Sequence, residues 1–125
     1  KVVTIRVQGA STTAAAKRVA DTIATSNLVK TALFGEDANW GRIIAAIGRS
    51  GVAIDPNKVT VRFNDIVMVQ RGVGTGLEAE HKIAQVFKRK EFTITVQLGQ
   101  GQAHAHMWTT DLSYDYVRIN ASYRS

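Results

Sequence analysis

The sequence contains no cysteine in 125 residues. Disulfide bonds and thiolate metal sites are therefore excluded. Long apolar runs are also missing, because the longest cover only residues 43–47 and 66–69, whereas a membrane-spanning helix needs about 20 residues. These absences favour a soluble domain with no membrane segment, of the type found in the cytoplasm.

The first residues have neither the shape of a signal peptide nor an initiator methionine. In residues 1–6, polar side chains interrupt the apolar ones at once, whereas a signal peptide needs a continuous apolar stretch. The missing methionine indicates a processed or excised piece of a longer protein.

Positive charges moderately outnumber negative ones. There are 16 Lys and Arg against 10 Asp and Glu, which gives a formal charge of +6. Such a field can attract nucleic acid, an anionic cofactor or carboxylate substrates, and it can equally belong to a solvated surface. The one compact basic run, residues 88–90, falls at the expected end of a helix, where cations complement the helix dipole. We therefore interpret this run as a solvated face.

The pattern of apolar residues predicts a single small α+β domain over residues 1–125. Alternation indicates strands, and a spacing of three and four residues indicates helices. The predicted order is a strand at 2–7, helices at 13–25 and 40–48, a hairpin at 59–70, a helix at 77–88 and a second hairpin from strands near 92–98 and 103–109. This order is typical of a mixed sheet with helices packed on one face.

Several short patterns resemble functional sites but are weak. The glycine-rich stretch 72–76 precedes a helix but lacks the lysine and hydroxyl residue of a phosphate-binding loop, so we expect a connector. His104 and His106 project from one strand face, yet no third ligand is evident, so no metal site is predicted. Glu78 and Glu80 suit the first turn of a helix. No spacing defines a catalytic set of residues.

Nucleic-acid binding would need aromatic and basic side chains interleaved on a sheet face. The candidates are Arg62 with Phe63 on an expected strand, together with the tyrosines and arginines of residues 114–124. Phe63 falls on the inward phase of its strand. We therefore expect no nucleic-acid partner.

Two longer stretches carry a family resemblance. Residues 28–42, LVKTALFGEDANWGR, resemble the central signature of the ornithine acetyltransferase family, also called glutamate N-acetyltransferases. Residues 111–125, DLSYDYVRINASYRS, resemble the C-terminus of the same family. The intervening parts follow in the family's order, so the chain is identified as the C-terminal domain of the family's β chain.

The resemblance implies a reaction and its partners. Members of the family transfer an acetyl group from N2-acetylornithine to glutamate through an acetyl-threonine intermediate, within arginine biosynthesis. The nucleophile is the threonine that autocatalytic cleavage exposes at the start of the β chain. The resemblance further implies a cytoplasmic oligomer of αβ units, such as a heterotetramer, and no tightly held cofactor, with acetyl-CoA as an alternative donor. The partners of this segment would be the α chain and the N-terminal part of the β chain.

The resemblance also assigns residues. The family's substrate-binding asparagine matches Asn120, and its terminal hydroxyl residue, often a threonine, matches Ser125. The nucleophilic threonine and a substrate-binding glutamate would lie upstream of Lys1, so no catalytic residue is expected in this chain, and Thr4 in its strand is no substitute. For the motif at 35–42 we expect a structural role, with Trp40 in the core. The alternative reading is a non-catalytic binding or assembly module for nucleic acid or protein.

Overall fold

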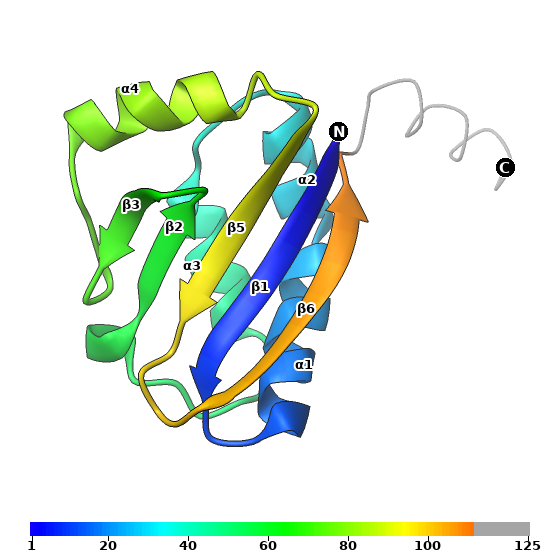
Figure 1. Ribbon diagram of the computed structural model, residues 1–125, viewed down its shortest axis with the longest axis vertical. Coiled ribbons are helices and arrows are strands. Elements are labelled where there is room, and N and C mark those ends of the chain that lie inside the picture. Colours follow the sequence, from blue (N-terminus) through cyan, green and yellow to red (C-terminus); the bar gives the residue numbers. More distant parts are fainter. Residues whose placement is uncertain (112–125) are drawn as a thin grey trace, which may run out of the picture.

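Six strands form one mixed sheet in the order β4-β3-β2-β5-β1-β6 (Figure 1). The computed structural model describes residues 1–111. The strands are β1 (Val2–Ala10), β2 (Thr60–Phe63), β3 (Ile66–Gln70), β4 (Val73–Gly74), β5 (Glu91–Gln97) and β6 (Ala103–Thr110). The helices are α1 (Thr13–Ala24), α2 (Asn27–Phe34), α3 (Trp40–Gly48) and α4 (Leu77–Val86), with a short 3-10 helix, η1 (Pro56–Lys58). The predicted α+β class is confirmed.

The apolar half of each strand faces the helices. Alternation along β1 buries Val3, Ile5 and Val7 completely, and β5 buries Ile94 and Val96 in the same way. Figure 1 shows α1, α2 and α3 on one side of the sheet, and α4 packs beside β3 at its edge. The expectation of helices on one face is therefore confirmed for α1, α2 and α3, while α4 lies at the edge of the sheet. The opposite face carries most of the polar side chains of the strands.

The predicted closing hairpin is wrong, because β1 lies between β5 and β6. It pairs with β5 in parallel and with β6 antiparallel. The connection at 98–102 passes the end of β1, where Leu98 N donates to Gln8 O at 2.9 Å and Gln100 N donates to Gly9 O at 2.7 Å. Periodicity identifies a strand but not its neighbour in the sheet. The prediction therefore paired β5 with β6, which are consecutive in sequence but separated by β1 in the fold.

The helix α2 was not predicted. Its buried residues, Val29, Ala32 and Leu33, follow the helical spacing, but exposed Leu28 and Phe34 blur the stripe in the sequence. The Ser26 hydroxyl caps its start by accepting a hydrogen bond from Val29 N at 3.3 Å. A sequence of eight residues with apolar side chains on both sides gives little amphipathic signal.

Other local predictions are confirmed. The helix α3 has the predicted bounds, and of the two side chains that could cap its start, Asp37 and Asn39, the structure uses Asn39. The two-residue turn after β2 contains Asn64 at φ 52°, a left-handed conformation that asparagine tolerates well. The Asn64 side chain also accepts a hydrogen bond from Thr93 N at 2.9 Å, which fixes the turn to β5. Within residues 1–111, no helix has the length and apolar character needed to cross a membrane.

Candidate functional site

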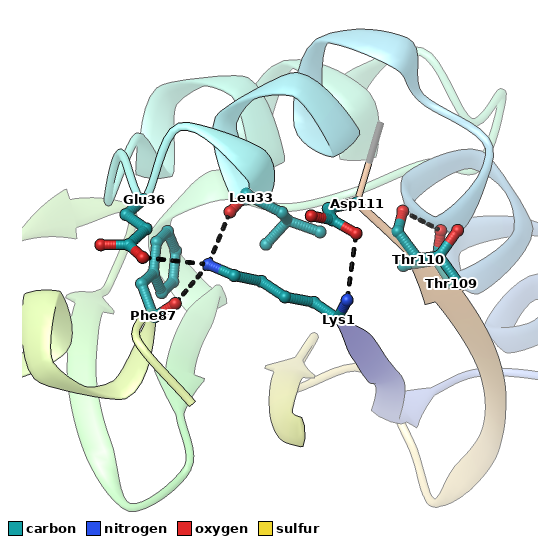
Figure 2. A network of polar contacts seen from close by, with 7 residues as sticks. All are labelled: Lys1, Leu33, Glu36, Phe87, Thr109, Thr110 and Asp111. Atoms are coloured by element: carbon teal, nitrogen blue, oxygen red, sulfur yellow. Dashed lines mark hydrogen bonds and ion pairs between the residues drawn. The ribbon is translucent and has the colours of Figure 1, made fainter. Parts of the chain in front are cut away.

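Lys1, just before β1, is surrounded by acceptors from separate segments (Figure 2). Its ammonium Nζ donates to Leu33 O at 3.0 Å and to Phe87 O, and it lies 3.8 Å from a carboxylate oxygen of Glu36. Leu33 is in the last turn of α2, and Phe87 is the C-cap of α4. The carbonyl groups at a helix C-terminus carry partial negative charge. The ends of two helices therefore share one cation, which is only 13% exposed.

The main chain of Lys1 lies beside the end of β6. The backbone nitrogen of Lys1 donates a hydrogen bond to Asp111 Oδ1 at 3.1 Å. The adjacent Val2 pairs with Thr110. The start of β1 and the end of β6 thus meet at one corner of the domain, as Figure 2 also shows.

The polar groups of the 35–42 motif form most of their hydrogen bonds within the motif or with the neighbouring helix α2. Asn39 Oδ1 accepts from Arg42 N at 3.3 Å, and Arg42 Nη1 donates to Leu28 O at 2.9 Å. Asp37 N donates to Ala32 O at 2.9 Å, and Glu36 adopts a φ of 55°. These contacts close α2 against the start of α3, which is the structural role expected from the sequence.

The glycine-rich stretch packs closely against other segments. A side chain at Gly72, whose φ is 77°, would place its Cβ 2.4 Å from Pro56 O. One at Gly74 would lie 3.0 Å from the ring of Trp40, which is half-buried against the core as expected. Small residues at these two positions are explained by packing. The prediction of a plain connector is wrong for Val73–Gly74, which form the short edge strand β4 paired with β3.

The start of α4 does not favour an anion. Its N-cap is Gly76, which supplies no side-chain hydrogen bond, and Glu78 and Glu80 occupy the first turn as predicted. Two carboxylates beside the exposed N–H groups would repel a phosphate. Glu78 instead lies 3.5 Å from Lys82 in an exposed pair one turn along the helix.

A hollow lies on the open face of the sheet, opposite α1, α2 and α3. It has a volume of about 590 Å³. The lining side chains come from β1, β2, β5, the turn after β2, the start of β3, the end of α4 and the segment after it. They are Arg6, Gln8, Arg62, Asn64, Asp65, Ile66, Val86, Arg89, Thr93 and Thr95. Sequence reasoning missed this hollow, because the outward phase of each strand was visible but the order of the strands was not.

The histidines are placed apart from any metal-binding group. His104 and His106 are exposed on β6, and the ring of His106 meets that of Trp108 edge to face at 5.2 Å. His81 is exposed on α4. Among residues 1–111, no three His, Cys, Asp or Glu side chains gather closely enough to hold a metal ion.

The sheet-face candidates for nucleic-acid binding are not brought together. Phe63 is completely buried in the core, where its ring contacts that of Phe87 at 5.2 Å, so it cannot stack on a base. Residues 88–90 are exposed after α4, as predicted. Thr4 is half-buried on the open face, within β1 and opposite Thr93.

The residues assigned to substrate binding, Asn120 and Ser125, lie outside the described residues. The same holds for the tyrosines and arginines at 114–124. Their assignments therefore stay predictions from the sequence. The structure does describe Asp111, from which that segment continues.

Comparison with known proteins gives a consistent result. A family model described as the ArgJ family matches residues 1–125. The arginine biosynthesis bifunctional proteins ArgJ of Geobacter sulfurreducens and Syntrophotalea carbinolica are 52% and 50% identical over all of this chain, which covers 32% of each relative. A crystal structure of the Bacillus halodurans protein of that name is 41% identical, with a TM-score of 0.90 over 98% of this chain and 58% of that one. The chain thus spans about a third of the length of these curated relatives.

Proposed function

The chain belongs to the ArgJ family, and from this premise we propose that it is the C-terminal domain of the β chain of an arginine-biosynthetic acetyltransferase. The complete enzyme transfers an acetyl group from N2-acetylornithine to glutamate. This segment supplies the C-terminal residues that bind the amino-acid substrate. The α chain and the N-terminal part of the β chain complete the site, in a cytoplasmic oligomer of αβ units.

The observation that carries the proposal is the match over the whole chain. Relatives named for arginine biosynthesis are about half identical along all 125 residues, with no gap in the coverage of this chain. Since the chain corresponds to about a third of each relative, it contributes a part of the reaction and not the whole of it.

The corner formed by Lys1 and Asp111 supports the role of the C-terminal residues. The segment that contains Asn120 and Ser125 continues from Asp111, which contacts Lys1. In a longer chain, residues preceding Lys1 would leave the domain from the same corner. Substrate-binding groups after Asp111 and groups before Lys1 can therefore reach one pocket without crossing the domain.

The proposed chemistry divides the work between the parts of the enzyme. A threonine hydroxyl attacks the acetyl carbonyl of N2-acetylornithine, and the α-amine of that threonine takes the hydroxyl proton. The amide C–N bond then breaks, the same proton passes to the leaving nitrogen, and ornithine departs as the acetyl-enzyme forms. The amine of glutamate then attacks the acetyl ester and regenerates the threonine. A carboxamide at Asn120 and a hydroxyl at Ser125 offer hydrogen bonds to the substrate's carboxylate and amine without adding a competing charge. Acetyl-CoA would be an alternative donor in the first step.

The test is ornithine release from N2-acetylornithine and glutamate. We expect no activity from this chain alone and activity after it is combined with the α chain and the N-terminal part of the β chain. A folded mixture that releases no ornithine would contradict the proposal.

Asn120→Ala tests the substrate assignment in the same assay. Loss of a hydrogen bond to a charged group is worth about 1.5–3 kcal/mol, so kcat/KM for the amino-acid substrate should fall by roughly 10- to 100-fold. The matched control is Asn57→Ala in η1, an exposed asparagine of the described domain. Equal kcat/KM values for the two variants would contradict the assignment of Asn120 to substrate binding.

A further inference from the structure

Three arginines line the hollow on the open face of the sheet. Arg6 projects from β1, Arg62 from β2 and Arg89 from the segment after α4. Within residues 1–111, none of them forms an ion pair. Asp65 is the single acidic residue among the lining side chains, so the hollow carries a local excess of positive charge.

The register of the sheet sets two of these arginines on either side of a threonine. Arg6 pairs with Thr95 across β1 and β5, and Thr95 pairs with Arg62 across β5 and β2. All three side chains lie on the open face, because their neighbours along each strand are buried on the helix side. Strands are spaced about 4.8 Å apart, so the two arginine backbones are roughly 10 Å apart with a hydroxyl between them.

We propose that this hollow binds a small anionic molecule that carries two oxyanion groups, phosphate or carboxylate. The two guanidinium groups each present several N–H donors in a fixed plane that matches the oxygens of either group. The Thr95 hydroxyl donates from the floor between them, and Arg89 adds a third cation at the end of α4.

The three arginines are exposed, and two of them stand on inner strands of the sheet. Strands β1, β5 and β2 are three of the four inner strands of the sheet, so Arg6 and Arg62 do not stand at an edge. Asn64 in the turn after β2, Ile66 at the start of β3 and Val86 at the end of α4 line the hollow and give it walls.

The test is titration of the 125-residue chain with pyrophosphate and, separately, with glutarate, followed by NMR shifts of backbone amides and arginine side chains. We expect saturable shifts confined to residues of the hollow, at physiological ionic strength, with a Kd in the roughly millimolar range or tighter. Tighter binding of pyrophosphate would identify a phosphate ligand, and tighter binding of glutarate would identify a dicarboxylate.

Two matched double variants distinguish binding at this site from attraction by the net positive charge of the protein. Arg6→Gln with Arg62→Gln should weaken binding by at least about tenfold, because each charged hydrogen bond is worth about 1.5 kcal/mol or more. Lys17→Gln with Arg18→Gln removes the same charge from exposed positions on α1, on the helix side of the sheet, and should leave Kd within about twofold.

Circular dichroism of each variant confirms that it is folded before the titration. Two results would overturn the proposal. One is the absence of localised shifts with either anion, and the other is equal weakening in both double variants, which would indicate attraction by net charge alone.

Discussion

At the scale of single residues, the side chain of Lys1 makes polar contacts with several segments that are distant in sequence. Its ammonium joins the end of α2, the end of α4 and Glu36, while its backbone continues into β1 (Figure 2). The carboxylate of Glu36 is 46% exposed, and exposed ion pairs contribute little. The two carbonyl groups are therefore the larger part of the interaction.

Replacement of Lys1 by methionine tests this contact. The variant keeps the length of the side chain but leaves the carbonyl groups of Leu33 and Phe87 without their cation. We expect the free energy of unfolding to fall by about 1–3 kcal/mol, measured by urea denaturation. Lys82→Met is the control, since Lys82 forms only an exposed pair with Glu78 and should cost about 0.5 kcal/mol or less. Equal losses in the two variants would mean that Lys1 contributes no more than a surface lysine.

At the scale of elements, the cap of α2 explains how a weakly amphipathic segment becomes a helix. Ser26 is 8% exposed, and its hydroxyl accepts from Val29 N and from Arg49 Nη2 at 3.4 Å. The same residue thus starts α2 and links it to the end of α3. Because an eight-residue helix is marginal by itself, the cap and the packing of Leu33 decide whether it forms.

Ser26→Ala should lower the free energy of unfolding by about 1 kcal/mol, as loss of an N-cap does. Hydrogen exchange should speed up selectively in residues 27–34, because local opening of α2 no longer breaks the capping bond. Ser11→Ala, at an exposed position that caps no helix, is the control and should change neither quantity. Uniform exchange rates across the domain would show that α2 does not depend on its cap.

The elements differ in how far the sequence predicts them. The bounds of α3 were predicted because an apolar stripe and the capping side chain of Asn39 coincide there. The helix α2 is not predicted, because Leu28 and Phe34 are apolar yet exposed and so obscure its apolar stripe. For the open-face hollow, the outward phase of Arg6 and Arg62 was readable, but their common neighbour Thr95 was not, since strand order depends on contacts distant in sequence. The residues predicted to bind substrate, Asn120 and Ser125, lie outside the described part of the chain.

At the scale of the whole molecule, three phenylalanines join elements that are far apart in sequence. The ring of Phe87 after α4 lies 5.2 Å from that of Phe63 in β2 and 5.2 Å from that of Phe92 in β5. All three are nearly or completely buried. The edge helix and the central strands therefore belong to one core, and a single cooperative unfolding transition is expected.

Phe87→Ala tests this cooperativity. Truncation of a buried phenylalanine removes its burial and leaves a cavity, so the free energy of unfolding should fall by about 3–5 kcal/mol. Phe34→Ala is the matched control, because Phe34 is 46% exposed at the end of α2 and should cost about 0.5 kcal/mol. Melting followed by far-ultraviolet circular dichroism and by tryptophan fluorescence should give one coincident transition in both variants. Separate transitions in Phe87→Ala would contradict the expected single transition, because they would mean that α4 and the hairpin at 60–70 unfold independently of β1 once the ring is removed.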